Sequence, residues 1–158
     1  MLRYQETLVA FREIPDEVAL CINISGCPNK CEGCHSPHLW EDKGNILSVD
    51  VLSQLIEKNN GITCVCLMGG DNDPEEVNRL LKEIRNRDFK TGWYSGKEIL
   101  AHNVSLDNLD YLKMGPYVKA LGPLTSRITN QRVYKVIHED GNRLEDITYK
   151  FWKKGGEI

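Results

Sequence analysis

The stretch Ser25-Gly26-Cys27-Pro28-Asn29-Lys30-Cys31-Glu32-Gly33-Cys34-His35 decides how this chain is organised. Its three cysteines are spaced C-x3-C-x2-C and are half of the chain's six. Gly26, Pro28 and Gly33 disfavour a regular helix or strand, so we expect a loop that turns around a bound group. Three thiolates from one loop are typical of a soft metal centre.

The residues leave open which centre the loop binds. A cubane iron–sulfur cluster normally takes four thiolates, so three would hold three irons and leave the fourth open to a small molecule. A structural zinc site needs four protein ligands, and His35 or His38 could supply the fourth. A disulfide is the weaker interpretation, because the three cysteines are odd in number and close together. The spacing favours an iron–sulfur cluster, with zinc or an incidental group of thiols as alternatives.

The composition is that of a globular domain without a special partner class. With 158 residues, 41% hydrophobic and 27% charged, the chain can form one domain over residues 1–158. A net charge of −3 gives no electrostatic case for nucleic-acid binding. We find no apolar run near the ~20 residues of a membrane helix and no signal-peptide pattern. We therefore expect a cytoplasmic protein, in which thiols stay reduced and clustered cysteines are more often ligands.

Hydrophobic patterns predict strands that alternate with helices. Residues 17–25 alternate as a strand and run directly into the cysteine loop, which places the loop at the carboxyl end of that strand. Active sites of α/β folds usually lie at such ends. Further parallel strands are expected over residues 62–68, 90–95 and 109–114, with helices over 48–59 and from Asp73 onward.

The two ends of the chain and the remaining cysteines have simpler interpretations. The pattern of residues 1–16 predicts a first strand at the edge of the sheet, with the side chains of Phe11 and Ile14 covering the core. Residues 133–151 predict a β-hairpin with a glycine-containing turn. Cys21, Cys64 and Cys66 lie within predicted strands, where packed and inert thiols are expected.

A second motif follows the strand over 62–68. In Gly69-Gly70-Asp71, two glycines precede an acidic residue. Because glycine has no side chain, a ligand can approach the backbone amides and carbonyls at these positions. A tight strand-to-helix turn is the alternative interpretation. Ser95 stands at the end of the next strand, where it could contact a bound cofactor or form a turn.

These motifs resemble a known superfamily. C-x3-C-x2-C with one open iron resembles the radical S-adenosylmethionine (radical SAM) enzymes. The string SGCPNKCEGCHSPHLW (residues 25–40) resembles the small activating proteins of anaerobic ribonucleoside-triphosphate reductase. Many radical SAM enzymes have an aromatic residue before the third cysteine, whereas this chain has Gly33, as is typical of the activating-protein branch. Gly69-Gly70-Asp71 is similar to the superfamily's GGE or GGD motif.

The resemblance implies a fold and a set of site residues. The expected fold is α/β: an open, partial (βα) barrel of the radical SAM type, with a mostly parallel sheet and a C-terminal β-hairpin. The chain is too short for a full barrel, which needs ~200 residues or more. The resemblance implies that a [4Fe-4S] cluster is held by Cys27, Cys31 and Cys34. It implies that S-adenosylmethionine is bound by Gly33, Cys34, His35, Gly69, Gly70, Asp71 and Ser95.

The implied activity is that of a radical SAM oxidoreductase. In the resembling family, reductive cleavage of S-adenosylmethionine gives a 5′-deoxyadenosyl radical, which installs a glycyl radical on anaerobic (class III) ribonucleoside-triphosphate reductase. Flavodoxin or ferredoxin would supply the electron. No side-chain nucleophile or paired carboxylate is evident, so the catalytic chemistry is expected to belong to the cofactors.

Two other functions remain open. Another small radical SAM enzyme would share the cluster but act on a small molecule. A zinc- or cluster-stabilised binding module would carry out no reaction. The string over residues 122–132 is also similar to the activating-protein family, and Asn130 and Gln131 in it are expected to contact the partner.

Overall fold

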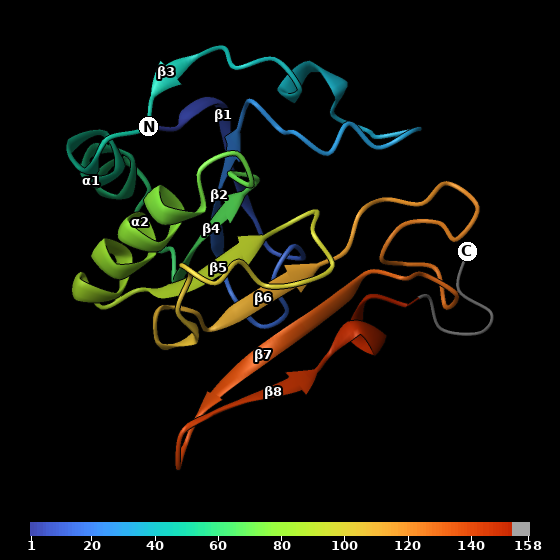
Figure 1. The fold of residues 1–158 in the computed structure, drawn as a ribbon. Coiled ribbons are helices and arrows are strands. Elements are labelled where there is room, and N and C mark those ends of the chain that lie inside the picture. Colours follow the sequence, from blue (N-terminus) through green and yellow to red (C-terminus); the bar gives the residue numbers. More distant parts are fainter. Residues whose placement is uncertain (153–158) are drawn as a thin grey trace.

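A single eight-stranded mixed sheet forms the frame of the protein in the computed structural model, which describes residues 1–152 (Figure 1). The strand order is β3-β1-β2-β4-β5-β6-β7-β8. The strands are β1 (Arg3–Ala10), β2 (Ala19–Ile24), β3 (Asn45–Ile46), β4 (Cys64–Met68), β5 (Lys90–Tyr94), β6 (Tyr111–Met114), β7 (Arg132–His138) and β8 (Asn142–Asp146). The helices are α1 (Val49–Lys58) and α2 (Pro74–Asn86), with 3-10 turns η1 (Pro37–Leu39), η2 (Leu106–Asn108) and η3 (Thr148–Phe151).

The centre of the sheet is parallel and its two flanks are antiparallel. Strands β2, β4, β5 and β6 pair in parallel, whereas β1 pairs antiparallel with β2 and β3, and β7 with β6 and β8. Three of the seven pairings are therefore parallel, fewer than the mostly parallel sheet that the sequence predicted. The flanks differ because their connections contain no crossover helix to return the chain to the same end of the sheet. A partial barrel of the radical SAM type stays a prediction.

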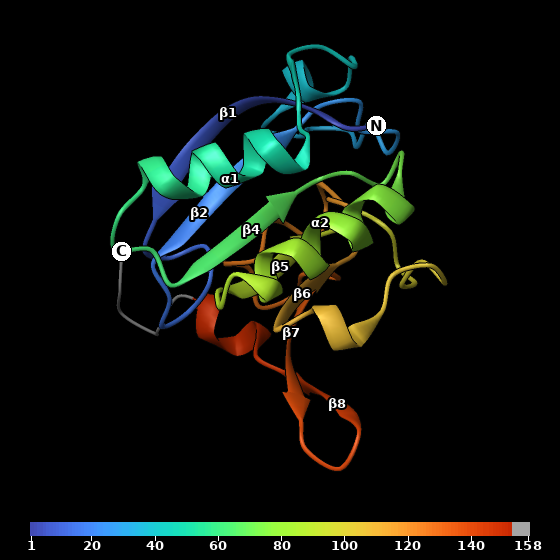
Figure 2. The ribbon, with the colours of Figure 1, turned by 90° about the vertical axis from the view of Figure 1, so that its left-hand side faces the viewer.

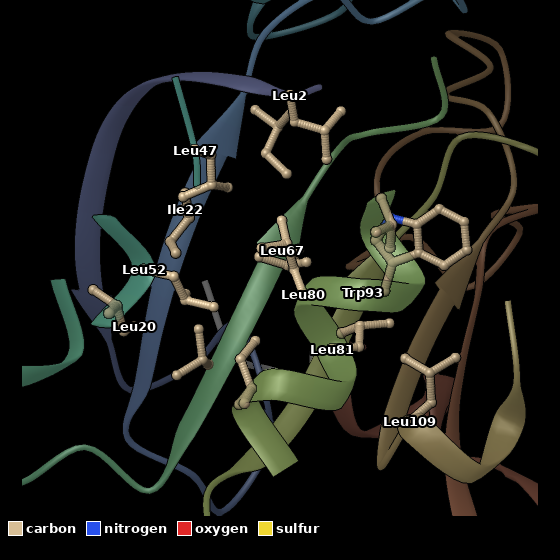
Figure 3. Packing of buried hydrophobic residues seen from close by; sticks show 14 of the residues in the cluster. Leu2, Leu20, Ile22, Leu47, Leu52, Leu67, Leu80, Leu81, Trp93 and Leu109 are labelled. Carbon is tan, nitrogen blue, oxygen red and sulfur yellow. The ribbon is translucent and has the colours of Figure 1, made fainter. Parts of the chain in front are cut away.

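Both helices cover the same face of the sheet, and the main core lies between them and the strands (Figures 2 and 3). Each helix begins where the sequence predicted, because Ser48 and Asp73 accept hydrogen bonds from Val51 N and Glu76 N. Every second residue of the central strands points into this core, as Ile22 of β2 and Leu67 of β4 show. The buried members from strands and helices include Leu20, Ile22, Ile24, Leu52, Val65, Leu67, Val77, Leu80, Leu81 and Trp93.

The opposite face of the sheet carries a second, smaller core. Cys21, Cys64 and Cys66 lie here as free thiols with Ile14 and Tyr111, which confirms that these cysteines are packed inside. Burial raises the pKa of the Cys64 thiol, and a hydrogen bond with Cys21 together with burial raises that of Cys66. Protonated, inaccessible thiols are poor nucleophiles and poor metal ligands.

The N-terminal segment departs from its prediction in two respects. Strand β1 is not an edge strand, because Asn45 and Ile46 form β3 and pair on its outer side. Phe11 is 72% exposed, although Ile14 is fully buried as predicted. The strand ends at Ala10, and the bend that follows turns Phe11 outward while it returns Ile14 to the second core.

A buried carboxylate joins the amino-terminal ends of the central strands. Glu17 accepts hydrogen bonds from Thr63 Oγ1 (2.7 Å), Tyr111 Oη (2.8 Å) and Lys90 Nζ (3.1 Å). Burial alone would raise the pKa of Glu17, but these three donors outweigh it and hold the pKa below its usual value. The ionised carboxylate therefore stabilises the folded state.

We expect Glu17→Gln to destabilise the protein at pH 7 by about 2 kcal/mol, because it removes a charge-assisted acceptor from three donors. A depressed folded pKa means that this stabilisation is present above the unfolded pKa of ~4.3 and is lost as the pH falls through the folded pKa. The difference in free energy of unfolding between Glu17→Gln and wild type should therefore become smaller at acidic pH. Urea unfolding at several pH values measures it, with Glu145→Gln on exposed β8 as the control. A pH-independent difference would contradict the electrostatic explanation.

Candidate metal centre

The cysteine loop lies at the carboxyl end of β2, beside the turns that follow β4 and β5. Cys27, Cys31 and Cys34 are free, partly buried, and line one cavity of about 1160 Å³. Three residues of the loop have left-handed backbone: Gly26 (φ 77°), Lys30 (φ 45°) and Gly33 (φ 76°). Because the chain reverses at these positions, three nearby cysteines can face the same cavity.

Two of the sulfurs already accept hydrogen bonds. Ser36 N–H donates to Cys34 Sγ at 3.3 Å, and Asn29 Nδ2 donates to Cys27 Sγ at 3.6 Å. N–H donors of this kind orient cluster ligands and adjust their electron density. The loop therefore provides both thiols and donors to those thiols.

The donor set at this cavity differs in its fit to a single zinc ion and to an iron–sulfur cluster. Within residues 1–152, no group of three or more His, Cys, Asp or Glu side chains has a geometry that could hold a single metal ion. Thiols are the ligands that a cubane cluster takes, and three of them line one cavity here. His38, one of the two proposed zinc ligands, instead pairs with Glu6 (Nε2 to Oε1, 2.9 Å). His35 lines the cavity beside the thiols, with its ring 5.6 Å from that of Tyr117.

The second motif meets the loop at this cavity. Gly69 and Asp71 line it together with the three cysteines. The Gly69 carbonyl accepts a hydrogen bond from Trp93 Nε1 (2.7 Å), and its N–H donates to the Tyr94 carbonyl (3.0 Å). Gly70 is buried behind the cavity wall, with φ at +98°, and an added Cβ would lie 2.6 Å from Val77 Cγ2. These contacts fix the path of the Gly69-Gly70-Asp71 backbone.

Asp71 is held by donors from two other segments. Its Oδ1 accepts from Ser95 Oγ (2.6 Å), and its Oδ2 accepts from Gly96 N (2.8 Å) and Asn29 Nδ2 (2.7 Å). Ser95, predicted as a cofactor contact, is buried and donates to Asp71 in this structure. Of the seven predicted cofactor residues, Cys34, His35, Gly69 and Asp71 line the cavity directly.

Sequence reasoning missed several residues at this site. Lys113 on β6 lines the cavity, and its Nζ donates to the carbonyls of Gly115 (2.8 Å) and Ser95 (3.3 Å). Burial lowers the pKa of Lys113 to about 8, while Asp71 and the three loop thiols act in the opposite direction. The available signal was a lysine inside an otherwise apolar strand. Asn29 was also overlooked, although it stands between two cysteines of the motif.

The loop between β6 and β7 closes another part of the cavity. Gln131 lines it, as do Pro123 and Leu124. Asn130 Nδ2 donates to the Pro116 carbonyl at 3.1 Å, which ties the two ends of the loop together. This contact gives Asn130 a structural role, while partner contact by Asn130 and Gln131 stays a prediction.

Comparison with known families adds an independent finding. A family model described as a 4Fe-4S single cluster domain matches residues 17–137. The chain belongs to this family. The matched region contains the cysteine loop, Gly69-Gly70-Asp71 and Lys113. No curated protein and no solved structure matches the chain.

The family membership makes this chain an iron–sulfur protein with a 4Fe-4S cluster-binding domain. Cys27, Cys31 and Cys34 are the cysteines whose surroundings fit the cluster, since the other three are buried in the second core. No helix within residues 1–152 is long and apolar enough to cross a membrane.

We expect Cys27→Ala, Cys31→Ala and Cys34→Ala each to lose most of the iron and sulfide that the reconstituted protein binds, because each removes one ligand. Cys66→Ala is the matched control, since it removes a cysteine that is fully buried elsewhere. Iron and sulfide analysis after anaerobic reconstitution measures the effect. Loss of the cluster in Cys66→Ala, or full retention in all three loop variants, would contradict the assignment.

We expect Gly70→Ala to destabilise the protein by about 1–3 kcal/mol more than Gly61→Ala. Both glycines have positive φ, +98° and +84°, so both variants carry the backbone strain of a left-handed residue. Only Gly70 has a neighbour in the way, because no atom lies within 4 Å of an added Cβ at Gly61. Urea denaturation compares the two, and equal losses would show that Val77 relaxes without cost.

Proposed function

We propose that the protein is a radical SAM activating enzyme. It uses a [4Fe-4S] cluster and S-adenosylmethionine to install a glycyl radical on anaerobic ribonucleoside-triphosphate reductase. The observation that carries this proposal is the meeting of two motifs at one cavity: the C-x3-C-x2-C loop and Gly69-Gly70-Asp71. The first motif alone would suit a cluster with no catalytic role, whereas Gly69-Gly70-Asp71 beside it is similar to the motif that binds S-adenosylmethionine in the resembling superfamily.

The number of available thiols supports an open iron. Within residues 1–152 the cavity is lined by three cysteines, Cys27, Cys31 and Cys34. The chain's other cysteines face the second core, where burial raises the pKa of Cys64 and a hydrogen bond with Cys21 together with burial raises the pKa of Cys66. Three protein ligands leave one iron of a cubane free for an exogenous ligand, as an open coordination position does in catalytic metal sites.

The residues around the cavity would bind and orient such a ligand. When bound, the cluster and S-adenosylmethionine would supply the radical chemistry that takes a hydrogen atom from a glycine Cα of the reductase. Trp93 and Tyr94 hold the Gly69 backbone in place, and Asp71 is fixed by three donors. The Lys113 ammonium offsets negative charge from the thiolates and Asp71. Such fixed dipoles and charges are what a protein contributes to cofactor chemistry.

The size and extent of the cavity support a large substrate. Its volume of about 1160 Å³ exceeds the ~300–1,000 Å³ typical of small-molecule sites. From the cysteines it extends to the bend after β1 and to the C-terminal segment, where Phe11, Phe151 and Trp152 line it. A cofactor at the cysteine end therefore leaves space for a segment of a protein substrate. The electron would come from a partner such as flavodoxin or ferredoxin.

The decisive experiment is anaerobic reconstitution with iron and sulfide, followed by reduction and addition of S-adenosylmethionine. We expect 5′-deoxyadenosine as a product and a change in the electron paramagnetic resonance spectrum of the cluster when S-adenosylmethionine is added. With anaerobic ribonucleoside-triphosphate reductase present, we expect the signal of a glycyl radical. The Cys31→Ala variant should give none of these results.

Each other outcome assigns a different function. Formation of 5′-deoxyadenosine without a glycyl radical on the reductase would favour a small radical SAM enzyme with a small-molecule substrate. A colourless, zinc-loaded protein that leaves S-adenosylmethionine intact would overturn the enzyme proposal. It would favour the binding module instead.

A further inference from the structure

Asn29 connects the cysteine loop to the acidic turn of the site. Its Nδ2 carries two hydrogens and has two partners, Asp71 Oδ2 at 2.7 Å and Cys27 Sγ at 3.6 Å. Asn29 belongs to the loop after β2, and its partly buried side chain reaches Asp71 in the turn after β4. Both donor hydrogens of one amide are therefore directed at the site, one at a sulfur and one at a carboxylate.

The carboxylate end of this connection is rigid. Asp71 accepts from Ser95 Oγ (2.6 Å) and Gly96 N (2.8 Å), which belong to the turn after β5. These two donors hold the Asp71 carboxylate independently of Asn29. The turns after β4 and β5 therefore fix the position of the Asn29 amide through Asp71. The fixed amide directs its second hydrogen at Cys27 Sγ.

The space around Asn29 is matched to its side chain. A Cβ added at Gly96 would lie 2.4 Å from Asn29 Nδ2 and 3.0 Å from Asn29 Cγ. Glycine at position 96 is therefore required for the amide to reach both partners. This close approach is an observation independent of the hydrogen bonds.

We propose that Asn29 is a positioning residue that fixes Cys27 and raises the reduction potential of the cluster. An N–H donor withdraws electron density from a thiolate, which stabilises the more negative, reduced form of the cluster. Asp71 is the anchor of this device, and Gly96 is the residue that leaves space for it. The inference rests on ligation of the cluster by Cys27 under the proposed function, but not on S-adenosylmethionine or on the partner.

The test compares Asn29→Ala and Gly96→Ala with wild type after anaerobic reconstitution. Asn29→Ala removes the donor, whereas Gly96→Ala keeps the amide and displaces it. We expect both variants to retain iron and sulfide and to shift the midpoint potential of the cluster to more negative values. Asn72→Ala, an exposed asparagine next to Asp71, is the matched control and should keep the wild-type potential. Potentiometry followed by electron paramagnetic resonance, without S-adenosylmethionine, gives the potentials.

A second measurement uses the protein without its cluster. Asn29→Ala, Asp71→Ala and the double variant form a cycle of unfolding free energies. We expect the double variant to lose less stability than the sum of the single variants, because both break the same hydrogen bond. Strict additivity would overturn the contact on which the proposal depends.

The outcomes separate this inference from the proposed function. A wild-type protein that takes up no cluster would overturn both. A wild-type protein that binds the cluster, with potentials unchanged in Asn29→Ala and Gly96→Ala, would overturn only the role of Asn29. A shift in both variants and none in Asn72→Ala would establish it, since a residue that only stabilises the fold has no reason to move the potential in one direction.

Discussion

The site depends on the Asp71 carboxylate, which accepts hydrogen bonds from the segments after two other strands. Asn29 reaches it from the cysteine loop, and Ser95 and Gly96 reach it from the turn after β5. The cysteine loop and the turns after β4 and β5 are irregular connections. Because they converge on one carboxylate at the carboxyl ends of parallel strands, they form one wall of a cavity. The acid therefore acts as the structural centre of this rim, and the polar atoms around it are satisfied mainly by one another.

The sheet divides the six cysteines of the chain into two chemical classes. Strand alternation directs Cys21, Cys64 and Cys66 toward the second core, where burial helps keep the thiols of Cys64 and Cys66 protonated. The loop cysteines follow the end of a strand, where left-handed residues turn them toward a partly open cavity. Thiolates ligate iron and buried thiols do not, so position in the fold decides which cysteines can serve a cluster.

The sequence predicted the parts of the protein that are local. Ser48 and Asp73 marked the helix starts, because a cap is a contact within one turn of the chain. The cysteine spacing indicated an iron–sulfur cluster, which the family match supports. The antiparallel flanks were underestimated, since strand direction depends on connections and not on residue pattern. Asn29 and Lys113 were missed for a similar reason, because Asp71 and Ser95, to which their side chains donate, lie far along the chain.

A contact with a distant residue explains why glycine, and not an aromatic residue, precedes the third cysteine. Gly33 stands where many radical SAM enzymes carry an aromatic residue. A Cβ added at Gly33 would lie 3.2 Å from Tyr117 Cε1, a ring that the loop after β6 brings against His35. Larger side chains at position 33 would have to displace that ring, and they would also need the left-handed backbone at φ +76°. The aromatic surface beside the third cysteine is therefore supplied from a different segment, so a change at position 33 and a change at position 117 act on the same space.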